Sequence, residues 1–298
     1  MCHRLRSRTL GALILVLSLG AAAGAQTPHP SFTVTVTGDG PAMLLIPGLL
    51  STGEVWDSTV ERYKNRYTLH VLTLAGFGGP APVGAPFLAR VRDEVIIYLR
   101  EQQLQKTVIV GHSLGGFLGF WIAATAPELV GGLVAVDGVP FLPALGNPAA
   151  TEATAKPQAE QIKAIYASLS NAQLVAQTRM ALATMITAPA HVEQAAAWAT
   201  RSDSATAGLA VAELASTDLR GATATITAPT LLIGATGAAP EAMRPAMAKA
   251  YESQVSSIKD ARVIMADKAR HFIMFDDPSF LFAALDQFLA ARRAGADR

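Results

Sequence analysis

The stretch "TVIVGHSLGGF" (residues 107–117) joins a short apolar run to a glycine-rich segment with helical spacing. Residues 107–110 predict a buried strand, and residues 111–127 predict a helix that stops near Pro127. The G-x-S-x-G pentapeptide around Ser113 falls at the junction between them. On such a sharp turn the serine is held in a strained conformation that exposes its hydroxyl. The alternative is a glycine-rich turn that merely opens a helix.

The chain on both sides of this stretch alternates between strand-like and helix-like patterns. Strands are expected over residues 32–38, 42–48, 68–74, 107–110, 129–136, 228–235 and 261–267. Helices are expected over residues 53–67, 87–103, 111–127, 239–258 and 278–293. Continuous apolar runs are typical of strands buried on both faces. The pattern therefore predicts the α/β class, with a mostly parallel sheet flanked by helices.

Residues 141–221 interrupt this alternation. They contain no convincing strand and are rich in Ala, Gln and Thr, with helical stretches such as "AEQIKAIYASL" (159–169). We interpret this segment as a helical insertion. Residues 26–140 and 222–298 then form one α/β core.

The first 25 residues have the layout of a secretory signal peptide. Arg4, Arg6 and Arg8 precede an apolar stretch from residue 10 to 19, and Ala23-Gly24-Ala25 is a fitting cleavage site. The stretch is shorter than the roughly 20 residues that span a bilayer, which disfavours the alternative of an uncleaved anchor. We therefore expect cleavage near Ala25, a secreted or periplasmic protein, and no stable membrane insertion after cleavage.

The composition excludes several classes of partner and cofactor. Loss of the first 25 residues leaves 21 basic and 23 acidic residues and no cysteine. A nearly neutral chain without a Lys/Arg cluster predicts no nucleic-acid partner. The sequence also contains no metal-binding Cys/His cluster, so neither a metal nor a cofactor is expected. Nothing in it sets an oligomeric state.

A serine hydroxyl needs a base to act as a nucleophile near neutral pH. Of the six histidines, His271 follows the last predicted strand and precedes the last helix. Strand ends on the same edge of an α/β sheet converge there, so His271 is the expected base. His112 adjoins the serine in sequence, so its side chain is expected to point away from the hydroxyl. The other four histidines are expected to be structural, superficial or lost with the signal peptide.

Acyl transfer also requires donors for an oxyanion and an acid that orients the base. We call the sharp turn around Ser113 the elbow. The expected donors are the backbone N–H of Leu114, at the start of the helix after the elbow, and that of Leu49, after Gly48. Asp137, in "VAVDGVP" (134–140), ends a predicted strand. It is either an ordinary turn former or the acid.

Taken together, these motifs resemble the α/β-hydrolase superfamily, in its esterase/lipase-like branch with a helical cap. The resemblance rests on residues 47–51, "LAGFGG" (74–79), the elbow, "APTLLIG" (228–234) and "RHFIMFDDP" (270–278). It implies a mostly parallel eight-stranded sheet with the catalytic triad on loops at one edge, and it makes residues 141–221 the cap. One departure is Pro47-Gly48, where the family commonly has His-Gly.

A second departure concerns the acid. The resemblance implies an acid just after the strand that resumes beyond the cap, but residues 234–240 contain none. Glu241 comes next and is expected to open a helix. A minority of the family takes the acid from the strand before the cap, which here is Asp137. Asp137 is therefore the expected acid, with Glu241, Asp267 or no acid as alternatives. Asp276 and Asp277 are expected to be helix-capping residues.

These residues imply two-step acyl transfer through an acyl-enzyme. Ser113 attacks an ester carbonyl, and water activated by His271 releases the acid. The expected substrate is a small molecule, an apolar acyl or aryl ester, roofed by cap residues such as Met180, Leu182 and Met185. The alternatives are a lactone, amide or carbon–carbon bond hydrolase, a haloperoxidase-like enzyme, or a catalytically inactive binding protein.

Overall fold

A computed structural model describes residues 29–296 of the chain. The expected signal peptide and its cleavage site lie outside the described residues. Within residues 29–296, no helix combines the length and apolar character needed to span a bilayer.

The core of the described chain is one mostly parallel sheet of seven strands in the order β1-β3-β2-β4-β5-β6-β7. Only β1, at one edge, runs antiparallel to its neighbour β3. The strands are β1 (Phe32–Thr37), β2 (Ala42–Ile46), β3 (Thr68–Leu74), β4 (Thr107–His112), β5 (Val130–Val136), β6 (Thr230–Ala235) and β7 (Ala261–Ala266).

The expectation of eight strands is wrong for the part of the chain that the structure describes. Seven strand-like runs can be read from the sequence, and each of them forms a strand. The eighth strand was implied by the family resemblance alone. No described segment pairs with the outer edge of β1, so the sheet ends there.

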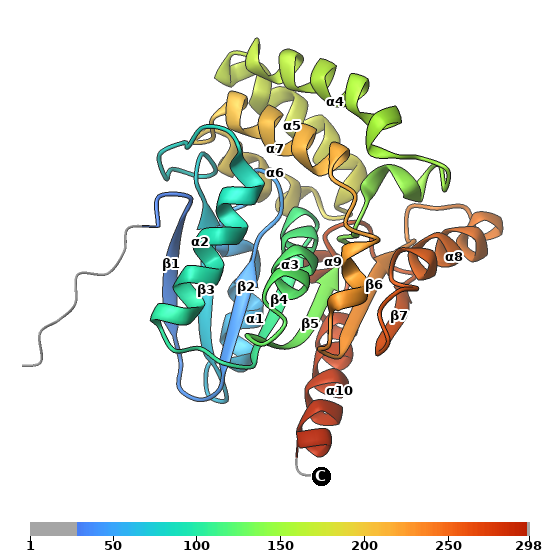
Figure 1. Cartoon of the computed structure of the whole chain (residues 1–298). Helices are drawn as coiled ribbons and strands as arrows, with labels where there is room; N and C mark the ends of the chain where they lie inside the picture. The colour runs from blue at the N-terminus through green and yellow to red at the C-terminus, as the bar shows by residue number, and fades with distance from the viewer. Residues whose placement is uncertain (1–28, 297–298) are drawn as a thin grey trace, which may run out of the picture.

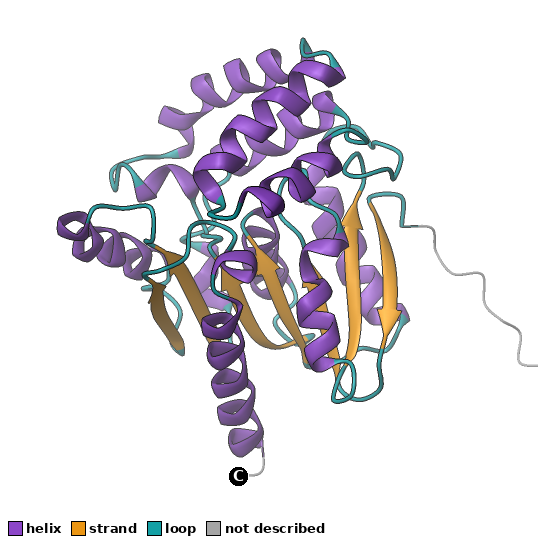
Figure 2. Cartoon of the chain, turned by 180° about the vertical axis from the view of Figure 1, so that it is seen from behind, coloured by secondary structure: helices purple, strands orange, loops and turns teal. Residues whose placement is uncertain are grey.

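Helices cover both faces of this sheet. Helices α2 (Phe87–Glu101), α3 (Leu114–Thr125) and α8 (Arg244–Gln254) lie on one face, and α1 (Asp57–Tyr63) and α10 (Pro278–Ala296) lie on the other (Figures 1 and 2). The short α9 (Ile273–Asp276) precedes α10. Four 3-10 helices complete the described elements: η1 (Gly53–Trp56), η2 (Leu142–Leu145), η3 (Ala222–Thr225) and η4 (Glu241–Met243).

The central strands are apolar over most of their length because each of their faces is buried under a helical layer. Along β4, Ile109 packs into the core beneath α2 and α3, whereas Val108 and Val110 pack into the core on the opposite face. Successive side chains of a strand point to opposite faces, so a strand between two layers needs apolar residues at every position.

Four helices form the segment between β5 and β6 and lie over the carboxyl ends of the strands (Figure 1). They are α4 (Glu152–Ala167), α5 (Asn171–Met185), α6 (Pro189–Ala199) and α7 (Ser204–Ser216). The side chains of Thr151, Ser170 and Asp203 accept hydrogen bonds from first-turn N–H groups at the starts of α4, α5 and α7. Such caps satisfy donors that a helix start otherwise leaves unpaired. We call residues 141–221 the cap.

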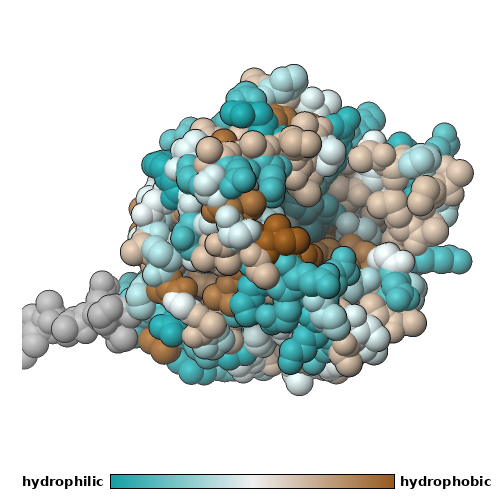
Figure 3. All heavy atoms as spheres, turned by 90° about the horizontal axis from the view of Figure 1, so that it is seen from above, coloured by the Kyte–Doolittle hydropathy of each residue, from teal (hydrophilic) through white to brown (hydrophobic). Residues whose placement is uncertain are grey.

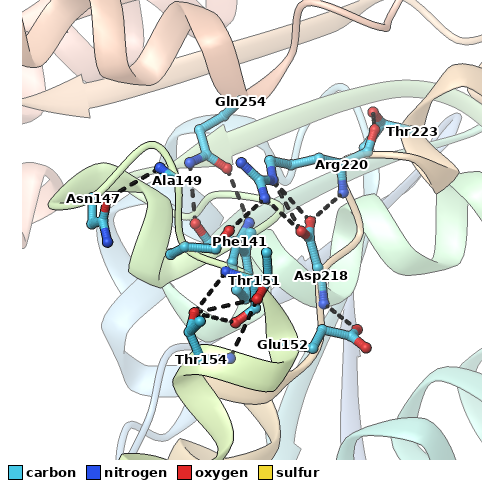
Figure 4. A network of polar contacts seen from close by, with 11 residues as sticks. Phe141, Asn147, Ala149, Thr151, Glu152, Thr154, Asp218, Arg220, Thr223 and Gln254 are labelled. Atoms are coloured by element: carbon cyan, nitrogen blue, oxygen red, sulfur yellow. Dashed lines mark hydrogen bonds and ion pairs between the residues drawn. The ribbon is translucent and has the colours of Figure 1, made fainter.

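The two ends of the cap meet in one polar network (Figure 4). The Gln254 side chain of α8 accepts from the backbone N–H of Phe141 and donates to its carbonyl oxygen. Arg220 pairs with Asp218 and donates to the carbonyl oxygen of Ala150. The entry and exit of the cap are therefore fixed to each other and to α8.

Close backbone contact around the elbow generates a prediction about stability. A Cβ atom at Gly115 would lie 2.2 Å from the carbonyl oxygen of Ile46, a backbone atom that cannot move aside easily. We expect Gly115→Ala to lower the free energy of unfolding by about 2–3 kcal/mol, as overpacking does. Urea unfolding measures the change.

Gly146→Ala is the matched control. Gly146 has a right-handed helical backbone, and a Cβ atom added there would have nothing within 4 Å. We expect its free energy of unfolding to stay within about 0.5 kcal/mol of the unmodified protein. Equal effects of the two substitutions would contradict the close approach of α3 to β2.

Candidate active site

Ser113 occupies the sharp turn between β4 and α3. Its φ of 53° and ψ of −117° form a combination that residues other than glycine rarely adopt. The turn needs glycine on both sides, since a Cβ atom at Gly111 would lie 2.1 Å from the carbonyl oxygen of Gly115. Strain of this kind persists where the surrounding structure enforces it and is common at active sites.

Two predicted site residues far apart in the chain are in direct contact. His271, between β7 and α9, places its Nδ1 2.6 Å from Oδ2 of Asp137, which follows β5, 134 residues earlier. A carboxylate only accepts hydrogen bonds, so Nδ1 carries the proton and Nε2 of His271 is left able to accept one. This is the tautomer that a general base needs.

Ser113 and His271 line the same cavity. Within residues 29–296, Ser113 Oγ makes no hydrogen bond, either to His271 or to another group. Contacts of this kind are often long in the absence of substrate and tighten when it binds.

The alternative acids are placed elsewhere. Glu241 begins η4 and is exposed. Asp267 is also exposed, and its Oδ1 accepts a hydrogen bond from the Thr236 hydroxyl. In the described chain neither of them contacts His271, so Asp137 is the acidic residue positioned to orient it.

Asp137 is itself held firmly. Its Oδ1 accepts hydrogen bonds from the backbone N–H of Ala235, at 2.8 Å, and from the Tyr251 hydroxyl, at 2.6 Å. Its own N–H donates to the carbonyl oxygen of Ile233. Burial, reinforced by the charge of Asp137, raises the pKa of Tyr251 far above its usual range, so the phenol stays protonated and acts as the donor.

His112 supports His271 from the other side. Its Nε2 donates to the carbonyl oxygen of His271 at 3.1 Å, and the two ring centroids are 4.7 Å apart. The buried Nδ1 of His112 has no hydrogen-bond partner among the described residues. Burial, and secondarily the nearby His271, holds the pKa of His112 well below its usual value, so His112 remains neutral. A neutral, buried ring packs against His271 without competing for its proton.

The two expected oxyanion donors are unpaired in the described structure. Leu114 is the first residue of α3, and Leu49 lies in the turn after Gly48 and lines the same cavity as Ser113. Neither backbone N–H has a hydrogen-bond partner within residues 29–296. The positive end of the α3 dipole adds to the attraction that these N–H groups offer a negative charge.

The cavity above Ser113 is small, with a volume of about 160 Å³, and the cap forms one side of it. Its lining contains no Lys, Arg, Asp or Glu side chain; it consists of Leu49, Leu50, His112, Ser113, Tyr166, Gln177, Thr178, Ala181, Leu182, Met185, His271 and Phe272. Leu182 and Met185 contribute as expected. Met180 does not line the cavity: it is 74% exposed, because it projects from the outer side of α5. From above, apolar groups gather beside a hollow near the centre of this face (Figure 3).

The loop that carries His271 is attached to the junction between α5 and α6. Asp276 accepts from the backbone N–H and the hydroxyl of Thr187. Arg270 donates to the carbonyl oxygens of Ala183 and Ile186. Asp276 is therefore a bridge to the cap and not the helix cap that was expected, whereas Asp277 does cap α10 by accepting from the Phe280 N–H.

A larger cavity of about 630 Å³ lies beside α10, at the end of the strands opposite to the Ser113 cavity. Its rim carries Lys106, Arg262 and Arg292, but none of the predicted site residues lies there. In the described part of the chain, no group of three or more His, Cys, Asp or Glu residues is arranged to hold a metal ion.

The sequence did not predict the supporting roles of three residues: Tyr251, His112 and Asp276. Tyr251 lies in the middle of α8, 114 residues after Asp137, and nothing in its local pattern marks it. His112 stands beside the serine, but its hydrogen bond to His271 depends on the packing of distant segments. Asp276 was recognised only as a helix-start residue, since its partner Thr187 lies 89 residues away.

Comparisons with known proteins agree with this architecture. The model of the alpha/beta hydrolase family matches residues 43–285. A pimeloyl-(acyl-carrier protein) methyl ester esterase of Vibrio campbellii is 36% identical over 103 residues, which are 35% of this chain and 39% of that protein. The match thus spans about two fifths of the curated relative's length.

Solved structures share the fold over most of their length. A hydrolase from Pseudomonas aeruginosa superposes with a TM-score of 0.72 and 22% identity, over 87% of this chain and 94% of that one. An enol-lactonase from Burkholderia xenovorans gives a TM-score of 0.69 at 18% identity, over 87% and 96%. At these identities the likeness is one of fold.

The bridge through Asp276 generates a prediction about the reactivity of Ser113. Asp276→Ala removes three acceptor contacts, including that with the Arg270 N–H, and frees the loop that carries His271. We expect the rate at which a fluorophosphonate labels Ser113 to fall at least tenfold, because misplaced catalytic groups lose rate steeply.

Asp277→Ala serves as the control. It removes a helix cap from the adjacent residue and should cost about 1 kcal/mol of stability while leaving the labelling rate nearly unchanged. Labelling that is equally slow in both variants would mean that general destabilisation, not the bridge to the cap, sets the reactivity.

Proposed function

Because the chain belongs to the alpha/beta hydrolase family, we propose that it is a serine hydrolase that cleaves carboxylic esters through Ser113, His271 and Asp137. The observation that carries the proposal is the hydrogen bond between His271 Nδ1 and Asp137 Oδ2, because His271 lines the same cavity as Ser113. Nucleophile, base and acid thus come from the ends of three parallel strands at one edge of the sheet.

The proposed reaction has two halves. Ser113 Oγ attacks the ester carbonyl carbon while His271 Nε2 takes its proton, and Asp137 stabilises the imidazolium that forms. The N–H groups of Leu49 and Leu114 receive the negative charge on the carbonyl oxygen. Collapse breaks the carbon–oxygen bond, and the leaving alcohol takes the proton from His271. Water activated by His271 then hydrolyses the acyl-enzyme, releasing the acid and free Ser113.

The cavity favours small, uncharged, apolar groups next to the ester. About 160 Å³ accommodates a short alkyl, acyl or aryl group, and no charged Lys, Arg, Asp or Glu side chain lines the space. Similarity to a methyl ester esterase over 103 residues supports an ester substrate with a small alcohol part. We propose apolar acyl or aryl esters, with residues 1–25 directing export to the periplasm or the medium.

Hydrolysis of p-nitrophenyl esters from acetate to octanoate tests this proposal. We expect the purified protein to cleave the short members fastest and Ser113→Ala to lower kcat by about 10⁶-fold, leaving only residual catalysis. Unchanged activity in Ser113→Ala would refute the serine mechanism. Absence of hydrolysis in a panel that also includes lactones would favour a binding protein.

Two carboxylate variants identify the acid in the same assay. Asp137→Asn should lower kcat by about 10⁴-fold, because an amide cannot hold His271 in the required tautomer. Glu241→Gln changes an exposed residue outside the cavity and should leave kcat within twofold. A large loss in Glu241→Gln with Asp137→Asn nearly intact would transfer the acid's role to Glu241.

A further inference from the structure

We infer that Tyr251 is a positioning residue of this site: its hydroxyl fixes the Asp137 carboxylate so that Oδ2 faces His271. The inference rests on the proposed function and extends it to a residue outside the cavity. Tyr251 lies on α8, is 6% exposed and does not line the space above Ser113.

The two carboxylate oxygens of Asp137 have different hydrogen-bond partners. Oδ1 accepts from the Tyr251 hydroxyl at 2.6 Å and from the Ala235 N–H at 2.8 Å, whereas Oδ2 faces His271 Nδ1 at 2.6 Å. Rotation of the carboxylate would break all three hydrogen bonds. Since hydrogen bonds to charged groups are stronger than neutral ones, the arrangement holds Oδ2 in place.

Both donors to Oδ1 are tied to β6, the strand next to Asp137. Ala235 is its last residue, and the Tyr251 ring packs against Gly234, where a Cβ atom would lie 2.9 Å from the ring. Residues 234–240 carry no acid of their own. β6 and α8 therefore supply hydrogen-bond donors to Asp137, which follows β5. Gly234 leaves room for the Tyr251 ring that carries one of these donors.

Tyr251 also affects the electrostatics of the site. A donor on Oδ1 draws negative charge away from the carboxylate and so weakens its stabilisation of protonated His271. Removal of the Tyr251 hydroxyl leaves more of the negative charge on the Asp137 carboxylate. A variant without the hydroxyl should therefore show two separate effects: a less well oriented base and stronger stabilisation of the protonated imidazole by Asp137.

The test compares Tyr251→Phe with Tyr63→Phe in full-length protein. Tyr63 is buried as well, and its hydroxyl donates to Oδ1 of Asp286, on α10, at 3.0 Å and outside the cavity. Each substitution thus removes one buried phenolic donor from a carboxylate. Hydrolysis of p-nitrophenyl acetate is followed from pH 5 to pH 9, together with thermal unfolding.

For Tyr251→Phe we expect kcat to fall about 10- to 100-fold, the magnitude of one hydrogen bond to a charged group, with KM within twofold. The acidic limb of the kcat/KM profile should move upward by about half a pH unit or more. Tyr63→Phe should lower the unfolding temperature but leave kcat, KM and the pH profile unchanged.

The outcomes separate this inference from the proposed function. If Ser113→Ala or Asp137→Asn retains full activity, the proposed function fails whatever Tyr251 does. If both lose activity while Tyr251→Phe matches Tyr63→Phe, the function stands and the inference is overturned. A lower kcat with an unmoved acidic limb and a fall in unfolding temperature larger than that of Tyr63→Phe would also overturn it, because Tyr251 would then act only through stability.

Discussion

The hydrogen bond between His271 and Asp137 is the interaction on which the candidate site depends. It joins segments 134 residues apart and requires the carboxyl ends of β5 and β7 to be held on either side of β6. Parallel strands end at one edge of a sheet, so the fold brings these side chains together. The donors on Asp137 Oδ1 come from β6 and α8, so four elements contribute to a single carboxylate.

A second level of support comes from the cap. Five hydrogen bonds connect residues 270–276 to the end of α5 and the α5–α6 junction, so the loop carrying His271 is shaped by the cap as well as by the sheet. The cavity above Ser113 has walls from both layers. The side chains that α5 contributes to its lining, Gln177, Thr178, Ala181, Leu182 and Met185, are all uncharged.

Short stretches of sequence were sufficient to predict the features that depend only on residues close together in the chain. The seven strands, the elbow around Ser113 and the base candidate His271 could be named because strand ends and turn motifs can be recognised in short stretches of sequence. Asp137 could be located in the same way as a residue at a strand end, but its choice as the acid came from the family resemblance. The roles of Tyr251, His112 and Asp276 depend on which helix packs beside which loop, and no short window contains both partners. Met180 was misplaced for the same reason, since periodicity identifies a helix but not which side of it meets the site. The eighth strand came from the family and not from the residues.

The attachment of the α5–α6 junction to the His271 loop restricts how this enzyme scaffold can be redesigned. Grafting another α5–α6 corner would replace the carbonyl groups of Ala183 and Ile186 that Arg270 binds, and so would disturb the loop that carries His271 along with the cap side of the cavity. The inward positions Gln177, Thr178 and Ala181 carry no such bond to that loop. The lining of the cavity can therefore be altered one to two helical turns away from the junction without changing the support of the imidazole.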